Sequence, residues 1–285
     1  MRVILVPVAD RPECAGALKT AFGVAKVHGA DLVGCHVRPH RDSAVKMPGL
    51  GGGTQAQWAA LQAGRNPQRD SRDARALFER IAGEAGHQLA SRPRADQAPV
   101  AIWQERVGSP DKVMPIVGPA SDLLVLSRPA KGGRVADLFL MEALLHACRP
   151  LLLLPQRRVR VPGRHILVAW NQSEEASRAV AAGMPMLKAA DAVTIAVAGP
   201  ERGPGPKATH LARYLRHHGV TADISRSRGR RPAEELEKLY EKADADLLLM
   251  GAYSRHRIRE RIFGGLTDHV LRRAGLPVLL YHSGG

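Results

Sequence analysis

The sequence contains an internal repeat, and this repeat constrains the fold more than any other feature of the chain. Four short segments of the first half recur in the second half in the same order. The matched pairs are 4–7 with 166–169, 30–37 with 190–197, 121–126 with 245–250, and 149–153 with 276–280. A chain of 285 residues has room for two domains of ordinary size. We therefore predict a duplicated domain, with one copy in residues 1–156 and the other in residues 164–285.

The first copy is longer than the second. The spacing from Ile4 to Asp122 is 118 residues, and the matching spacing from Ile166 to Asp246 is 80, which leaves an excess of 38 residues. Most of this excess falls near residues 47–72, where a run of glycines is followed by scattered Gln, Arg and Asn. Such a composition loosens regular structure, so we predict a flexible insertion there.

Short apolar runs alternate with helical patterns along the second copy. Buried strands are expected at 166–169, 193–197, 247–250 and 278–281. Helices are expected after the capping residue Ser173, from Ala208 to the stop signal Gly219, from Pro232, and over 266–273. This alternation is typical of an α/β fold, with a parallel sheet covered by helices on both faces.

Composition narrows the range of partners. The 42 basic and 27 acidic residues give a formal net charge of +15, which favours anionic partners. Aromatic residues are only 4% of the chain, so stacking platforms for single-stranded nucleic acid are few, and nucleic acid is not the expected partner. Three widely spaced cysteines without a C-x-x-C pair predict neither a disulfide framework nor a zinc site.

The apolar runs are all shorter than the roughly 18 to 20 residues that a membrane span requires. The apolar stretch at the N-terminus is also too short for a signal peptide. We therefore expect a cytoplasmic protein without a membrane span.

The loop at 251–267 carries the strongest chemical signal. In open parallel sheets, ligands bind at the carboxyl ends of the strands, where the strand order reverses. This loop follows a predicted strand, has glycines at both ends and contains four arginines. Its last residues, 264–267, open a predicted helix, whose free N–H groups attract phosphate.

Gly251, Ser254 and Gly264 follow the spacing of a glycine motif: Gly, two residues, Gly, nine residues, then Gly followed by Ser or Thr. With this spacing, the Asp-Leu-Leu run before the loop and the Leu-Pro-Val-Leu-Leu run near the C-terminus, the sequence resembles the universal stress protein family. Because both copies show the same order, the chain resembles the tandem bacterial type. The resemblance implies two Rossmann-like, or flavodoxin-like, doubly wound parallel-sheet domains. They are expected to form an internal pseudo-dimer through strands 151–154 and 278–281, and a further homodimer is an open alternative.

The resemblance also implies that the second copy binds ATP or another adenine nucleotide, with Mg²⁺ carried by the nucleotide, and acts in the stress response without rapid turnover. The nucleotide contacts it implies are Ala169, Asn171, Val197, Met250, Gly251, Ser254, Arg257, Gly264, Gly265, Leu266 and Thr267. Three of these residues depart from the family pattern. Asn171 replaces an aspartate, Ser254 replaces the middle glycine, and Gly265 replaces the Ser or Thr.

The first copy lacks the motif. Ser127, Ala130 and Leu140 stand at its three glycine positions, and the loop is three residues shorter. A phosphate site of the same kind cannot form there, so this copy is expected to be a structural partner.

Two other functions remain open. One is an enzyme that hydrolyses ATP slowly, although no nucleophile stands at a recognisable spacing from a base, so no catalytic residue is predicted. The other is a nucleotide-free interaction module that holds acidic partners through the net charge of +15. No group of His, Cys or carboxylate residues predicts a metal site.

Overall fold

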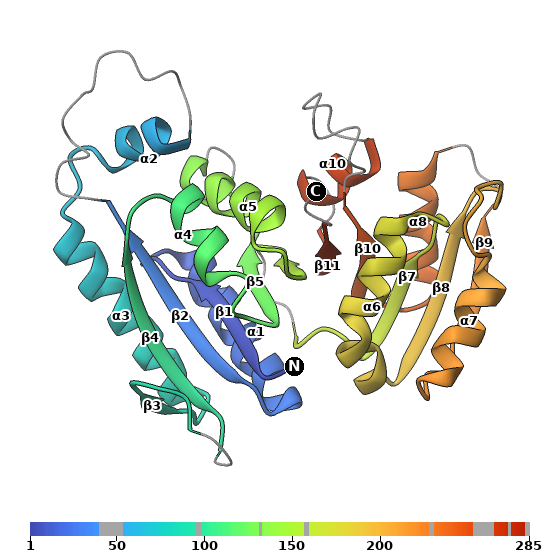
Figure 1. Ribbon diagram of the computed structural model, residues 1–285, viewed down its shortest axis with the longest axis horizontal. Coiled ribbons are helices and arrows are strands. Elements are labelled where there is room, and N and C mark those ends of the chain that lie inside the picture. The colour runs from blue at the N-terminus through green and yellow to red at the C-terminus, as the bar shows by residue number, and fades with distance from the viewer. Residues whose placement is uncertain are drawn as a thin grey trace. The chain divides into compact units, whose positions relative to one another are not determined.

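The computed structural model describes residues 1–39, 54–94, 98–130, 133–156, 160–227, 231–252, 265–272 and 275–282. The chain divides into two compact units (Figure 1). The first unit contains Met1–Arg149 and Gln156–Val161, and the second contains Pro150–Pro155 and Pro162–Gly285.

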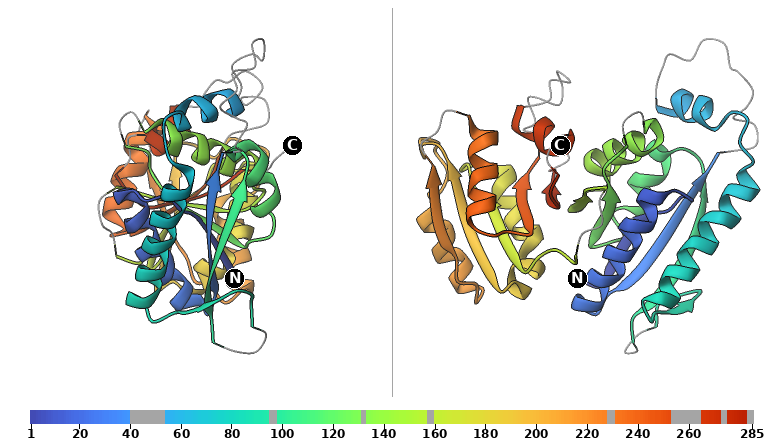
Figure 2. Two further views of the ribbon diagram at one scale, coloured as in Figure 1. Left: turned by 90° about the vertical axis from the view of Figure 1, so that its left-hand side faces the viewer. Right: turned by 180° about the vertical axis from the view of Figure 1, so that it is seen from behind.

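The first unit has a parallel sheet with the order β3-β4-β2-β1-β5. Its strands are β1 (Val3–Pro7), β2 (Asp31–Arg38), β3 (Gln88–Ala90), β4 (Val100–Val107) and β5 (Leu123–Ser127). Helices α1 (Pro12–His28) and α3 (Pro67–Glu84) cover one face, and α4 (Pro110–Val117) and α5 (Arg134–His146) cover the other (Figure 2). Helix α2 (Thr54–Gln62) packs on α4 and α5.

The predicted flexible insertion at 47–72 is wrong for the part that the structure describes. Residues 54–62 form α2, which Trp58 anchors: its side chain is buried and meets Phe139 edge to face, with 5.7 Å between ring centroids. Asn66 caps the next helix, which begins at 67. A single tryptophan in an otherwise polar stretch is a weak sequence signal, but burying it supplies enough apolar contact to order a short helix.

The second unit has the strand order β6-β11-β10-β7-β8-β9. Its strands are β6 (Leu151–Leu154), β7 (His165–Ala169), β8 (Ala192–Ala198), β9 (Asp223–Ser227), β10 (Leu247–Gly251) and β11 (Val278–Tyr281). All neighbours pair in parallel except β6, which lies antiparallel to β11 with Leu152 opposite Leu279. The last strand of the first repeat therefore completes the sheet of the second unit.

The second unit is also covered on both faces. Helices α6 (Glu174–Ala189) and α7 (Ala208–His217) lie on one face, and α8 (Pro232–Lys242) and α10 (Gly265–Arg272) lie on the other (Figures 1 and 2). The predicted α/β fold with doubly wound parallel sheets is confirmed, and the predicted helices and strands of this copy lie within a few residues of their observed bounds. Among the helices that the structure describes, none is both long and apolar enough to cross a membrane.

One carboxylate holds the start of each sheet. Asp122 Oδ2 accepts hydrogen bonds from the backbone N–H groups of Arg2 (2.5 Å) and Val3 (3.0 Å). At the matching place in the second unit, Asp246 accepts backbone hydrogen bonds from Gly163 (2.9 Å) and His165 (3.1 Å). The repeated aspartate therefore ties the strand that it precedes to the beginning of the neighbouring first strand.

Candidate functional site

The strand order of the second unit reverses between β7 and β10. From β7 the chain moves outward to β8 and β9, and then returns to place β10 and β11 on the other side of β7. In open α/β sheets the loops at such a reversal leave in opposite directions, and ligands bind in the crevice between them. We therefore call the carboxyl ends of β7 and β10 the switch-point crevice, or the crevice for short. The predicted site residues Ala169, Val197, Met250 and Gly251 all lie at this edge of the sheet. Val197 and Met250 are buried, and the other two are half-buried.

Gly251 is needed for close packing at this edge. A Cβ atom on Gly251 would lie 2.5 Å from the carbonyl carbon of Glu175 and 2.7 Å from the nitrogen of Ala176. Any larger residue would push the first turn of α6 away from the end of β10. The glycine therefore lets the N-terminus of α6 approach the strand, a role that differs from the predicted approach to a ligand.

Asn171 belongs to the turn that starts α6. Its Oδ1 accepts a hydrogen bond from the backbone N–H of Ser173 (3.2 Å), and the Ser173 hydroxyl accepts one from the backbone N–H of Ala176 (3.1 Å). Asn171 itself is exposed. Its amide nitrogen has no hydrogen-bond partner within the described part of the chain, so this donor is available at the mouth of the crevice.

The loop at 199–206, which follows β8, is fastened to the loop that follows β7. The Trp170 indole N–H donates to the carbonyl of Pro206 (2.9 Å). The Gln172 amide donates to the carbonyls of Gly203 (3.2 Å) and Gly205 (2.7 Å), and its Oε1 accepts from the Gly203 N–H (3.0 Å). We call the hydrogen bonds of Gln172 with Gly203 and Gly205 the Gln172 clasp. They hold the wall of the crevice beside Val197.

Sequence reasoning did not identify Gln172. Its φ of +64° lies in the left-handed region, where a non-glycine residue is disfavoured by about 1 kcal/mol. The hydrogen bonds of the clasp compensate for this strain. The partners are thirty residues away in a loop of Gly and Pro, and no local pattern marks such a contact.

Of the remaining predicted residues, Gly265, Leu266 and Thr267 lie in helix α10. Helix α10 begins at Gly265, and Thr267 in its first turn is buried. Of Gly265 and Leu266 the structure describes only the helical backbone. Ser254, Arg257 and Gly264 lie outside the described residues. The loop that carries most of the glycine spacing therefore remains a prediction from sequence.

The equivalent place in the first unit, at the carboxyl ends of β1 and β5, is lined by large side chains. Phe139 and Val135 line two hollows of about 70 and 50 Å³, and Trp58 of α2 lines the larger one. Each has room for a few water molecules. Ser127 and the buried Arg128 occupy the positions of Gly251 and Ala252. These contacts favour the prediction that the first copy has a structural role.

Comparison with known proteins finds similarity to one protein family. The model of the universal stress protein family matches residues 163–282. A universal stress protein from Archaeoglobus fulgidus DSM 4304 has a similar structure, with a TM-score of 0.66 at 15% identity over 99% of this chain and 96% of that one. A putative universal stress protein from Pseudomonas aeruginosa UCBPP-PA14 gives a TM-score of 0.56 at 18% identity over 99% and 93%.

A protein of unknown function from Pseudomonas aeruginosa PAO1 gives a TM-score of 0.57 at 17% identity over 99% and 92%. None of the curated proteins compared by sequence is significantly similar. The resemblance inferred from the glycine spacing is confirmed: residues 163–282 match the model of the universal stress protein family, and the whole length of the chain has the fold of solved universal stress proteins.

Proposed function

We propose that the second unit binds ATP or another adenine nucleotide in the crevice between β7 and β10, and that the protein acts in the cytoplasm as a stress-response regulator whose state depends on nucleotide occupancy. The observation that carries this proposal is the reversal of strand order at β7 and β10. It brings Ala169, Val197, Met250 and Gly251 to one edge of the sheet, at the position where open α/β sheets bind their ligands.

The chemistry of this edge suits an adenine nucleotide. The half-buried Ala169 and Gly251, with the buried Val197 and Met250 behind them, make this edge apolar enough for a flat base. The exposed Asn171 amide can donate a hydrogen bond to a ring nitrogen. The start of α10 follows on the phosphate side, and a helix N-terminus there favours anions. We propose a sensor, because no nucleophile in the sequence stands at a recognisable spacing from a base that could support rapid hydrolysis.

Gly264→Val tests this site. A β-branched side chain would block the approach of phosphate to the backbone, so ATP binding measured by titration calorimetry should be abolished. Leu140→Val, at the matching position of the first copy, should bind ATP like the wild type. Mass spectrometry of nucleotide released from the purified protein would identify the ligand. Equal ATP affinity in the wild type and Gly264→Val would contradict the proposal. Rapid hydrolysis of ATP by the wild-type protein would show that it is an enzyme.

A further inference from the structure

The positive charge of the protein is concentrated around α7. Residues 202–231 contain eight Lys and Arg residues and one acidic residue, Asp223, so this tenth of the chain carries a net charge of +7 out of +15. Arg202, Lys207, Arg213 and Arg216 are exposed there. The average composition of the chain conceals this local excess.

The matching helix of the first unit shows that the fold does not require such a surface. Helices α3 and α7 both follow the second strand of their repeat. Helix α3 carries four arginines and four acidic residues, and three of its arginines form ion pairs with the residue four positions later. These pairs are Arg69–Asp73 (3.5 Å), Arg75–Glu79 (2.7 Å) and Arg80–Glu84 (2.5 Å). Helix α7 contains no acidic residue at all.

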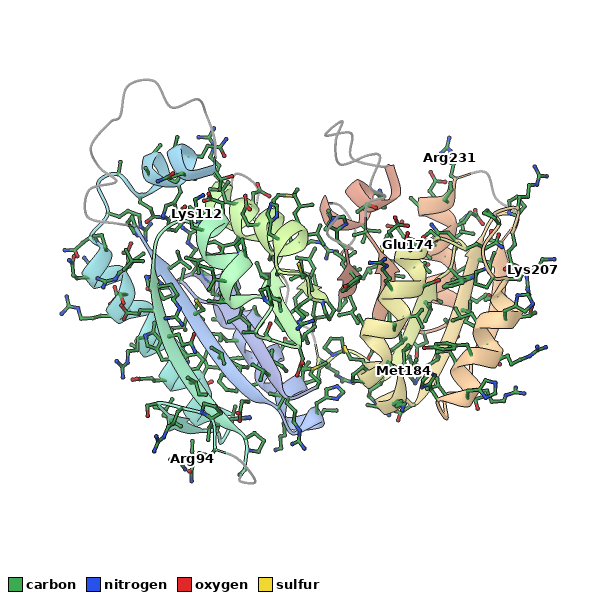
Figure 3. All side chains as sticks on the ribbon, viewed as in Figure 1. Arg94, Lys112, Glu174, Met184, Lys207 and Arg231 are labelled. Atoms are coloured by element: carbon green, nitrogen blue, oxygen red, sulfur yellow. The ribbon has the colours of Figure 1, made fainter. Side chains whose placement is uncertain are left out.

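The cations of α7 face solvent without ion-pair partners. Leu211 and Leu215 are buried and pack α7 against the sheet. Arg213 and Arg216 are exposed on the solvent side of the helix. Lys207 directly precedes the helix and lies at the outer margin of the second unit (Figure 3). None of these three forms an ion pair within the residues that the structure describes. At 1.5 Å per residue, they extend over about 13 Å.

The carboxylate of Glu201, which lies near the start of α7, already interacts with two other groups. Glu201 Oε1 accepts a hydrogen bond from the backbone N–H of Ala208 (2.5 Å), and Glu201 Oε2 lies 3.4 Å from a guanidinium nitrogen of Arg226. Its side chain is largely buried. It therefore caps α7 and pairs with Arg226 of β9, so it does not neutralise Lys207, Arg213 or Arg216.

We infer that the exposed surface of α7, defined by Lys207, Arg213 and Arg216, binds the phosphate backbone of a nucleic-acid duplex. These cations are spaced along and around the exposed surface of the helix and have no ion-pair partner within the described residues. Such a surface attracts phosphates mainly through counterion release, which needs no aromatic residues. A membrane-surface helix would need several exposed large apolar residues, but Tyr214 is the one such residue on α7, and its ring packs against His218 at 4.7 Å. Stacking of single strands needs several aromatic residues as well.

The test compares two triple variants of the full chain in fluorescence anisotropy with a 20-base-pair DNA duplex, over a range of salt concentrations and without nucleotide. Lys207→Gln/Arg213→Gln/Arg216→Gln removes three charges from α7. Arg69→Gln/Arg75→Gln/Arg80→Gln removes three charges from the paired face of α3. Both variants have the same net charge, and glutamine preserves helix propensity.

We expect the α7 variant to bind roughly tenfold or more weakly at low salt, with a salt slope smaller by about two to three, because each phosphate contact contributes about 0.9 to the slope. The α3 variant should bind like the wild type. Equal weakening of both variants would show that only net charge matters and would overturn the inference. Binding to vesicles of phosphatidylserine and phosphatidylcholine but not to the duplex, or tighter binding to single strands, would overturn it as well.

Discussion

At the scale of single residues, the same aspartate contact occurs in both units. Asp122 precedes β5, which lies next to β1, and Asp246 precedes β10, which lies next to β7. In each unit the aspartate carboxylate receives backbone N–H groups from the beginning of the first strand. Burial opposes ionisation of Asp122, but the hydrogen bonds from Arg2 and Val3 outweigh it and lower the pKa of Asp122 below its usual value. The charged form is therefore the one that stabilises the fold.

Asp122→Asn should lower the free energy of unfolding at pH 7, because it weakens the charge-assisted hydrogen bonds to the backbone of Arg2 and Val3. The loss should be only about 1 kcal/mol, because solvent screens the charge at this exposed position. A carboxylate with a lowered folded-state pKa stabilises the protein above its unfolded pKa of about 4, and this stabilisation is lost as the pH falls through the folded value. The difference between variant and wild type in urea unfolding should therefore shrink below about pH 4. Asp223→Asn, at an exposed site, should change stability little at any pH. A difference for Asp122→Asn that is constant with pH would exclude the charge as its cause.

At the scale of elements, the loop at 199–206 is ordered by contacts with the start of α6. The Gln172 clasp and the Trp170 indole join two segments that lie about thirty residues apart. The wall of the proposed nucleotide crevice therefore depends on side chains that lie outside the predicted glycine loop.

Gln172→Ala should loosen this wall. The variant retains the left-handed backbone conformation but loses the hydrogen bonds to Gly203 and Gly205, which should lower the free energy of unfolding by about 1 to 3 kcal/mol. It should also make the Arg202–Gly203 bond easier for trypsin to cleave, because cleavage requires local opening of the loop. Asn171→Ala removes a neighbouring side chain and preserves the clasp, so its cleavage rate should match the wild type. Equal cleavage of all three proteins would show that the clasp does not order the loop.

At the scale of the whole molecule, β6 connects the two repeats. It belongs to the first repeat by sequence, but it pairs with β11 in the sheet of the second unit. Its four leucines are all buried. We propose that domain boundaries at 1–156 and 164–285 describe the repeats, and that the antiparallel β6–β11 pair is the basis of an internal pseudo-dimer.

This arrangement predicts the behaviour of two fragments. The fragment 164–285 lacks β6, so the apolar edge of β11 is uncovered and should pair with β11 of a second copy. Light scattering at tens of micromolar should therefore show a dimer. The fragment 150–285 retains β6 and should be monomeric. A monomeric 164–285 fragment, or a dimer of both fragments, would contradict the proposed role of β6.

Local patterns in the sequence were sufficient for most elements of the second unit. Apolar runs marked β7, β8, β10 and β11, the Ser173 cap marked the start of α6, and Gly219, with φ of +80°, marked the end of α7. These signals act within one or two turns of chain, so they can be read without knowing the fold. The edge strand β9 was missed because its residues 223–227 are largely polar and half-exposed.

The duplication, the largely parallel order of the strands and the loops that follow β7 and β10 could be predicted from local patterns in the sequence. The ordering of α2 by Trp58, the contact of Gln172 with a distant loop and the pairing of β6 with β11 could be found only in the folded structure. Each of these rests on a contact between segments far apart in the chain. The energy of such a contact depends on burial and hydrogen-bond geometry that exist only after folding, and therefore leaves no local pattern in the sequence.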